Sequence, residues 1–308
     1  MKSMKLLAAA LALGLATQAQ AASLDRQEDA RTNSPKVSFV DAITGQKQSL
    51  VRCGVANPTV AERDAMERKL QDFRRSPDYF SKVNSLAADK IIPVYFHMIT
   101  TNSGAGAGTQ QQLIDQVAVL NAAYAGSGFQ FTLAGSHIVK NTTWYNGCAK
   151  SSIERAMKKA LAVNPKETFN VYTCGLGSGL LGYATFPNYY AENSFMHGVV
   201  MLNGALPGGS ASGYNGGDTL THEAGHYLGL YHTFQGGCVE PGDQVADTPA
   251  EAAPNFTCTP TDSCPQEGVD PVTNYMDYGN DACMTNFTAN QWTRMQEQVA
   301  LYKPNLGQ

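Results

Sequence analysis

Three of the six histidines of this 308-residue chain lie in one short stretch, HEAGHYLGLYH, between positions 222 and 232. If the stretch is helical, His222 and His226 project from one face, one turn apart, and both rings can bind one zinc ion. Gly229 can adopt the left-handed backbone that ends a helix, which lets His232 approach the same ion from another direction. Three neutral imidazoles and one water form an open tetrahedral site, which is typical of catalytic zinc.

A glutamate beside the first of these histidines indicates the reaction that such a site would support. Zinc lowers the pKa of a bound water from about 16 toward about 7. Glu223 can then take a proton as general base and pass it to a leaving amine, while the ion polarises the scissile carbonyl. The pattern therefore predicts hydrolysis of a peptide bond. The alternatives are ordinary helix histidines or a closed structural zinc site, which usually recruits cysteines and does not need a neighbouring glutamate.

A methionine downstream of the histidines completes a longer pattern. The stretch NYMDYG, residues 274–279, contains Met276. Alone, this methionine would be ordinary core filler. Together with the spacing HExxHxxGxxH it resembles the metzincin signature, in which a methionine in a tight turn lies under the zinc and supports it.

The elements expected around this stretch form two lobes. Residues 91–229 alternate strands and helices, which predicts an α/β N-terminal lobe with a mixed twisted sheet, backing helices and an active-site helix over residues 219–229. Residues 230–308 are rich in Gly, Pro, Asp and Cys, which predicts a loop-rich, disulfide-linked C-terminal lobe with one final helix. The other expected strands are 91–100, 129–139, 169–174 and 198–203, and the other expected helices are 60–75, 110–126, 151–163 and 288–302.

The chain begins with features of a secretory signal. Residues 1–21 combine Lys2 and Lys5, a short apolar run and a final Ala-Gln-Ala, which favours a cleaved signal peptide over a buried helix. No later stretch is apolar enough to span a bilayer, so we expect a secreted, extracellular protein that does not enter a membrane. The net charge of -4 without a basic stripe argues against nucleic acid as a partner, and we expect a monomer.

Beyond the zinc motif, the chain resembles the pappalysin family of metzincins, and within it the secreted fungal-type extracellular metalloproteases. The resemblance runs from Ile91 to about Tyr302 and implies a zincin fold. It also implies that Tyr278 swings in to donate a hydrogen bond to the oxyanion, although a packed aromatic is the alternative reading. The matching stretches are GLLGYATFP (179–187), GVVMLNGALPGG (198–209), THEAGHYLGLYHTFQGGC (221–238), GDQVADTPAE (242–251) and NYMDYGNDACMTNFTANQWTRM (274–295).

Seven cysteines in a secreted chain leave one unpaired. The resemblance implies Cys238–Cys264 and Cys258–Cys283, although spacing alone allows three pairings among these four, and Cys148–Cys174 would make the third bridge. The odd cysteine is Cys53, in the sequence VRCGV. The resemblance implies that its thiolate binds the zinc in a zymogen, within an N-terminal segment 22–90. The alternative is a disulfide from Cys53 to Cys148 or Cys174. Cleavage is plausible at Arg74-Arg75 or at Lys90-Ile91.

Several further candidates carry weaker signals. The loop EPGDQVADTP offers Glu240, Asp243 and Asp247 to a calcium ion, and a solvated acidic loop is the alternative. Asn-x-Ser/Thr sequons stand at Asn141, Asn255 and Asn286, for glycans if the source is a eukaryote. The resemblance places strand 198–203 at the sheet edge above the cleft, where it would pair with substrate backbone. It places Asp281 near the primed-side pocket, where it would favour basic side chains.

The function expected from these residues is a secreted zinc-dependent metalloendopeptidase that acts on protein and peptide substrates, with its catalytic domain at 91–308. A selective processing protease with one partner is an alternative within the same chemistry. A catalytically silent zinc protein that binds peptides is a second alternative, and the presence of Glu223 argues against it. His97, His137 and His197 are not at ligand spacing and are expected to be ordinary core or surface residues.

Overall fold

The computed structural model describes residue 26 and residues 29–31, 34–40, 47–84, 90–177 and 179–308. The expected signal peptide, residues 1–21, lies outside these residues. Within them, no helix combines the length and the apolar character needed to cross a bilayer.

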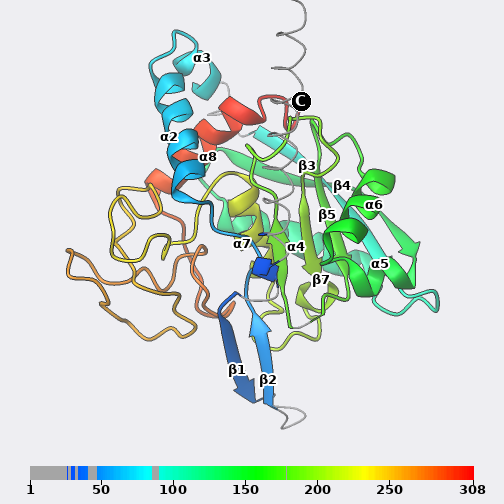
Figure 1. The fold of residues 1–308 in the computed structure, drawn as a ribbon. Coiled ribbons are helices and arrows are strands. Elements are labelled where there is room, and N and C mark those ends of the chain that lie inside the picture. Colours follow the sequence, from blue (N-terminus) through cyan, green and yellow to red (C-terminus); the bar gives the residue numbers. More distant parts are fainter. Residues whose placement is uncertain (1–25, 27–28, 32–33, 41–46, 85–89, 178) are drawn as a thin grey trace, which may run out of the picture.

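A five-stranded sheet forms the centre of the molecule, in the order β4-β3-β5-β7-β6 (Figure 1). The first four of these strands in space run parallel, and only β6 at one edge runs antiparallel to its neighbour. The sheet is therefore mixed, as expected. The bounds are β3 Lys90–Thr100, β4 Phe129–Lys140, β5 Phe169–Cys174, β6 Gly182–Ala184 and β7 Val199–Leu202.

The position of β7 corrects one expectation. Strand β7 was expected at the edge above the cleft, but it lies between β5 and β6. The edge strand is β6. It could not be predicted from the sequence, because Gly182–Ala184 is too short to show an alternation of apolar and polar residues. Any peptide that extends the sheet beside the active-site helix must therefore pair with β6.

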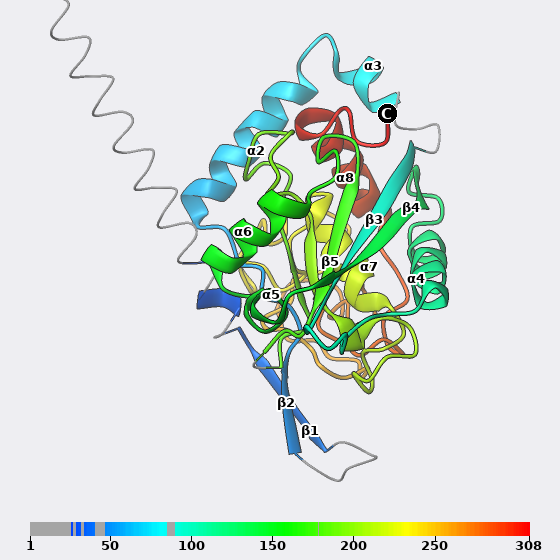
Figure 2. The ribbon, with the colours of Figure 1, turned by 90° about the vertical axis from the view of Figure 1, so that its right-hand side faces the viewer.

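Helices cover both faces of the sheet, and alternate strand residues supply the two cores. On one face, Val171 and Val199 pack in the main core with α4 and α7, while on the other Tyr172 and Val200 pack with α6. Figure 2 shows α4 and α6 on opposite sides of the strands. The bounds are α4 Gln110–Ala123, α5 Thr142–Gly147, α6 Ser151–Leu161 and α7 Asp218–Tyr227, with a single 3-10 turn, η1, at Asn203–Ala205.

The C-terminal part is irregular until its last helix, as its composition predicts. Helix α8, Ala289–Tyr302, begins at Thr288, whose side chain forms a capping box with Gln291. Met295 and Val299 of α8 enter the main core beside residues of α7. The final helix therefore packs in the same core as the active-site helix, although it follows the loop-rich region in sequence.

The N-terminal segment 22–90 folds onto this body. Its described residues include the antiparallel strands β1 Lys36–Val40 and β2 Lys47–Val51, and the helices α2 Val60–Arg74 and α3 Tyr79–Asn84. Helix α2 packs against the body, and its Leu70 and Phe73 are buried in the main core. Ion pairs from Arg74 to Glu297 and from Glu67 to Arg294, both at 2.6 Å, join α2 to α8.

Candidate active site

Helix α7 and the turn after it bring three histidines together. His222 and His226 lie on one face of α7, and both are fully buried. Gly229 has a φ of 108°, a left-handed conformation that turns the chain at the end of the helix. A side chain at Gly229 would also collide with Gln298 of α8, 2.5 Å away. The turn returns His232 toward the helix, so that its Nε2 lies 3.0 Å from Nε2 of His226.

The tautomers of these histidines follow from their second nitrogens. Nδ1 of His222 lies 2.6 Å from the carbonyl oxygen of Tyr275, and Nδ1 of His226 lies 2.8 Å from that of Leu230. A carbonyl oxygen can only accept, so each Nδ1 carries the proton and each Nε2 presents a lone pair. Nδ1 of His232 faces the side-chain oxygen of Asn57 at 3.2 Å, which favours the same tautomer.

These lone pairs converge on one point. Nε2 of His226 lies 3.2 Å from that of His222 and 3.0 Å from that of His232. Burial lowers the pKa of all three imidazoles, to about 4 for His226, so no ring proton bridges them at neutral pH. Three buried acceptors facing each other are repulsive unless a cation lies between them. The donor set therefore fits one metal ion, and three imidazoles suit zinc.

Glu223 lies beside this donor set and is not engaged by it. Its side chain is fully buried and its carboxyl group faces the thiol of Cys53, but among the described residues neither carboxylate oxygen makes a well-formed hydrogen bond. Burial raises the pKa of Glu223 to about 8. A buried carboxyl group held without a well-formed hydrogen bond next to a metal site is poised to exchange a proton there.

Met276 supports the histidines from beneath. Its side chain is fully buried, and a methyl group added at Gly225 of α7 would collide with its sulfur. Gly225 lies between the two helical histidines, so the methionine packs directly against that turn of the helix. The backbone of Met276 also accepts a hydrogen bond from Thr233, which follows His232.

Cys53 provides a fourth ligand atom at the same point. Its sulfur and the three histidine nitrogens all lie within 4.8 Å of one another, and all four residues are buried. Cys53 is the one cysteine outside the disulfides among the described residues. The alternative pairing with Cys148 or Cys174 does not occur, because these two are bonded to each other.

The segment that carries Cys53 lies along the sheet edge as an added strand. Val51 pairs with Leu180 in parallel, and the backbone N–H of Gly54 donates to Gly182 of β6 at 2.9 Å. Beyond Cys53, the hydroxyl of Tyr278 lies 3.4 Å from the carbonyl oxygen of Cys53. The tyrosine is buried, and its ring centroid lies 5.1 Å from that of His232.

Three comparisons place this site among known proteins. The sequence profile of the Peptidase_M43 family, described as pregnancy-associated plasma protein-A, matches residues 152–300. An extracellular metalloprotease of Sordaria macrospora is 44% identical over 221 residues, which are 70% of this chain and 76% of that protein. One from Colletotrichum graminicola is 40% identical and covers 87% of this chain and 98% of its own length. This chain belongs to the Peptidase_M43 family of metallopeptidases.

Similar solved structures share the fold. Mature mirolysin of Tannerella forsythia in complex with a cleaved peptide superimposes with a TM-score of 0.60 at 28% identity, over 71% of this chain and 98% of mirolysin. A promirolysin mutant from the same organism gives a TM-score of 0.62 at 26% identity, over 77% of this chain and 93% of promirolysin. The metzincin fold that the sequence predicts is therefore confirmed.

The candidate active site also contains a buried arginine, Arg52, that was not predicted from the sequence. Arg52 is fully buried beside Cys53 and donates to Thr219 Oγ1 at 2.9 Å and to the carbonyl oxygen of Asp218 at 3.1 Å. Its guanidinium lies 3.9 Å from Oδ1 of Asp281. The sequence shows only that Arg52 precedes Cys53 directly, and the burial that makes its acidic partner necessary appears only in the fold.

Asp281 also has a structural role that was not expected. Its Oδ2 accepts hydrogen bonds from the backbone N–H groups of Gly216, Gly217 and Asp218, at 2.7 to 3.4 Å. These residues lead into the first turn of α7, whose own N-cap, Gly217, has no side chain that could accept a hydrogen bond. The carboxylate therefore caps the active-site helix and complements the positive end of its dipole.

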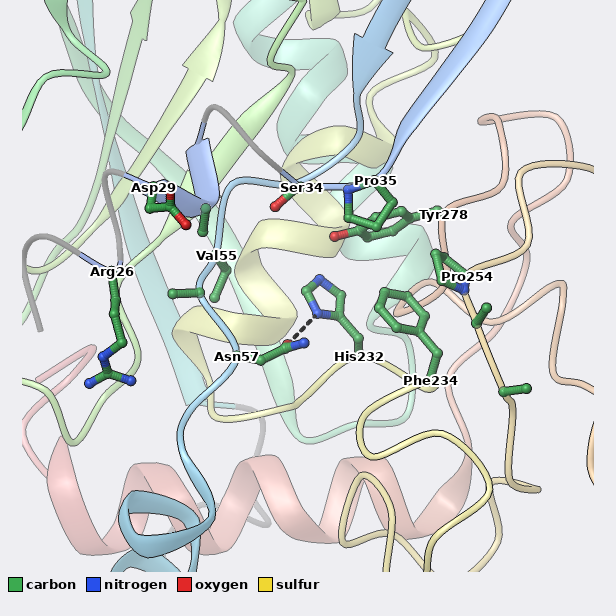
Figure 3. Close-up of a pocket in the computed structure, with 14 residues that line it drawn as sticks. Arg26, Asp29, Ser34, Pro35, Val55, Asn57, His232, Phe234, Pro254 and Tyr278 are labelled. Carbon is green, nitrogen blue, oxygen red and sulfur yellow. Dashed lines mark hydrogen bonds between the residues drawn. The ribbon is translucent and has the colours of Figure 1, made fainter.

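A cavity of about 430 Å³ remains between the N-terminal segment and the C-terminal part (Figure 3). His232, Phe234 and Tyr278 line it from the body, and Asn57 reaches His232 from the segment. Figure 3 shows Arg26 and Asp29 of the segment on the opposite side of Val55 from these rings. The segment therefore covers the metal site without filling all the space above it.

Three disulfides join the loops around this site. Cys238–Cys264 and Cys258–Cys283 are the crossed pairs that the resemblance implies, and Cys148–Cys174 joins α5 to β5. The first two lie in the C-terminal part, where they tie together the loops that carry Met276 and Tyr278.

The remaining candidates are the calcium ligands and the sequons, and the three calcium ligands do not converge on one point. Asp243 is buried and accepts from Val245 and Thr248, Asp247 accepts from Thr288 at the start of α8, and Glu240 is exposed. Among the described residues, these three carboxylates form no group of converging metal ligands. Of the three sequons, Asn286 is exposed and Asn141 and Asn255 are half-buried.

Proposed function

We propose that this chain is a secreted zinc-dependent metalloendopeptidase that hydrolyses extracellular proteins and peptides and is made as a latent zymogen. The observation that carries the proposal is the convergence of three histidine lone pairs beside the buried carboxyl group of Glu223. Secretion is supported by residues 1–21 and by the relatives, which are named extracellular metalloproteases.

Each nearby side chain has a place in the reaction. Zinc, when bound to His222, His226 and His232, supplies Lewis-acid activation of water and of the scissile carbonyl. Glu223 accepts the proton of the attacking water and returns it to the leaving amine. Tyr278 donates its hydroxyl proton in a hydrogen bond to the developing oxyanion. Substrate backbone pairs with β6, the path that residues 51–54 take in this chain.

Latency is supported by the way in which the N-terminal segment covers this machinery. Cys53 brings its sulfur to the metal position, and Tyr278 contacts the backbone of the same residue instead of a substrate. A thiolate is a strong zinc ligand and would take the position that a water needs. One of the similar structures is named promirolysin and another mature mirolysin, which agrees with a precursor that is converted to a mature form.

Release of the segment requires a cut, and the fold favours one of the two expected sites. Lys90-Ile91 opens β3, and both residues pair with β4. Arg74-Arg75 lies at the end of α2, where both side chains are exposed. A cut at Lys90-Ile91 would require β3 to leave the sheet, whereas Arg75 follows the last turn of α2 at the surface, where a helix end can fray. We therefore propose cleavage at Arg74-Arg75, which N-terminal sequencing of the active form would test.

The pocket around Arg52 suggests a substrate preference. Its guanidinium faces Oδ1 of Asp281, which has no hydrogen-bond partner among the described residues. A basic substrate side chain fits this position once the segment leaves. A selective processing protease would use the same chemistry, and a broad panel of protein substrates distinguishes it from a protease of broad specificity.

A calcium ion at Glu240, Asp243 and Asp247 stays a prediction that metal analysis of the purified protein would test.

The test of the function is hydrolysis of casein by the full chain after limited proteolysis. We expect activity that a zinc chelator abolishes and added zinc restores, and that the Glu223→Ala variant lacks, with a loss of at least about 10²-fold. Metal analysis should show one zinc per chain in both proteins, because Glu223 is not a ligand. A variant that keeps its activity, or a chelated protein that stays active, would refute the proposed mechanism.

A further inference from the structure

A second arginine of the N-terminal segment is held in a pocket of the body. The side chain of Arg31 is only 3% exposed, and its Nη2 lies 2.8 Å from a carboxylate oxygen of Glu154. Its Nη1 donates to the carbonyl oxygen of Ala149 at 3.0 Å, and its guanidinium carbon lies 3.8 Å above the ring of Tyr183. The pocket therefore meets a guanidinium with a carboxylate, a carbonyl group and an aromatic face.

The residues of this pocket all belong to the body. Glu154 lies on α6 and Tyr183 on β6, the edge strand of the sheet. Glu154 is also paired with the buried Lys158 at 2.8 Å, and Lys158 donates to the carbonyl oxygen of Met196. Because Lys158 remains as a partner, the carboxylate is still compensated after Arg31 leaves. Loss of the segment therefore exposes the pocket without leaving an isolated buried charge.

The pocket lies next to the path of substrate. Gly54 follows Cys53 and donates its N–H to β6, and a methyl group added at Gly54 would lie 2.9 Å from Cγ of Arg31. Arg52, on the other side of Cys53, enters the Asp281 position. The two arginine pockets are therefore separated by the metal position. If the Asp281 pocket is on the primed side, then the Glu154 pocket is on the amino side of the scissile bond.

We propose that Glu154, Tyr183 and the carbonyl group of Ala149 form a guanidinium-binding subsite, which Arg31 occupies in the latent chain and an arginine side chain of the substrate occupies after activation. The proposal rests on the proposed function, because it requires that the segment leaves and that a peptide replaces it along β6. Arginine fits better than lysine, because a planar guanidinium can bind the carboxylate and stack on the ring at the same time.

The test compares peptide substrates that differ at one residue. The full chain is purified and activated by limited proteolysis, so that the body folds with its segment in place. Peptides carry arginine, lysine or the neutral isostere citrulline at successive positions on the amino side of the scissile bond. At one position we expect arginine to raise kcat/KM by at least about tenfold over citrulline. Equal rates at every position would overturn the proposal.

Variants assign the preference to the pocket. Glu154→Gln should reduce the arginine-to-citrulline ratio to about one, whereas Glu267→Gln, at an exposed glutamate of the C-terminal part, should keep it. If Glu154→Gln does not fold because Lys158 loses its partner, the double variant Glu154→Gln/Lys158→Met removes both charges together. A ratio that survives the loss of Glu154 would refute the subsite.

A binding measurement separates this proposal from the proposed function. A fluorescent peptide of residues 26–57 is titrated into the activated Glu223→Ala protein, with Arg31 intact or replaced by citrulline. We expect the replacement to weaken binding at least about tenfold. If casein is never cleaved but the peptide effect is present, the function fails and the subsite stands. If casein is cleaved but the replacement has no effect, the subsite fails and the function stands.

Discussion

At the scale of single residues, this site depends on buried polar groups that have few hydrogen-bond partners in the folded chain. Glu223 makes no well-formed hydrogen bond among the described residues, and Tyr278 meets only a backbone carbonyl of the segment that covers it. Burying a polar group without a partner costs free energy. In the proposed mechanism the reaction supplies the partner, which is a proton for Glu223 and an oxyanion for Tyr278.

The role of Tyr278 can be tested by removing one atom. Tyr278→Phe keeps the buried ring against His232 but removes the hydroxyl donor. We expect kcat to fall about 10²–10³-fold with little change in KM, because the donor acts on the developing charge. Steady-state kinetics of the activated enzyme measures this. Tyr302→Phe on α8 is the matched control, and a similar loss of kcat there would show that the effect is structural.

A buried pair of carboxyl groups predicts the pH dependence of stability. The buried carboxyl groups of Glu251 and Asp277 interact with each other. The pKa of Glu251 is raised mainly by burial, and the neighbouring Asp277 raises it further. The folded chain therefore keeps a proton that the unfolded chain releases above an ordinary pKa of 4.5. This stabilisation is complete below that value and is lost as the pH rises toward the raised pKa.

Thermal unfolding from about pH 6 to about pH 9 measures this loss, which should approach about 1.4 kcal/mol per pH unit for one proton. Glu251→Gln keeps the hydrogen bond from Thr233 but cannot release a proton. We expect the variant to lose less stability than the parent over this range. Parallel pH profiles for the two proteins would contradict the shared proton.

At the scale of elements, helix α7 is positioned from three directions. Asp281 caps its first residues, Met276 packs beneath its histidines, and Gly229 ends it with a left-handed turn. Asp281 and Met276 are distant from α7 in sequence, whereas Gly229 directly follows the helix. The histidine motif is therefore local, but the orientation of its side chains depends on the loop-rich C-terminal part and on α8.

The contact between α7 and Met276 predicts the effect of a single methyl group. Gly225→Ala raises helix propensity by about 1 kcal/mol but places a carbon against the buried sulfur of Met276. Overpacking of this kind costs about 1–3 kcal/mol, so we expect a net loss of stability in denaturant unfolding. The variant should also bind zinc more weakly, because both helical histidines flank the site. A stabilised Gly225→Ala protein would show that the methionine can move aside.

At the scale of the whole molecule, the N-terminal segment is part of the fold and also covers the site. It contacts the body through residues 51–54 along β6, through Arg31 at Glu154, and through α2 against α8. Leu70 and Phe73 of α2 are buried in the main core. The proposed cut at Arg74-Arg75 lets residues 26–57 and α2 leave together, which frees the cleft and also exposes the part of the core that α2 covers.

The contribution of the cysteine to latency can be separated from these other contacts. In the uncut chain, Cys53→Ala removes the fourth ligand atom but keeps Arg31, Arg52 and α2 in place. We expect faster activation by limited proteolysis and measurable hydrolysis of a small peptide before any cut, while intact mass confirms that the chain is whole. If the variant is as silent as the parent until the segment is removed, the covering contacts and not the thiol maintain latency.

The sequence by itself determined the chemistry. The spacing of His222, Glu223, His226 and His232 requires only a helix and a turn, and both are set by residues within that stretch. The long helix α4 also follows from the helical spacing of its apolar residues, and β3 follows from its branched and aromatic content.

Only the tertiary structure decided what surrounds that chemistry. The edge position of β6, the cap that Asp281 gives to α7 and the pockets of Arg31 and Arg52 join residues that lie far apart along the chain. Periodicity and spacing report on neighbours in sequence, whereas a buried ion pair depends on which distant surfaces meet when the chain folds. The motif could therefore be predicted from the sequence, but the way in which the chain covers its own active site could not.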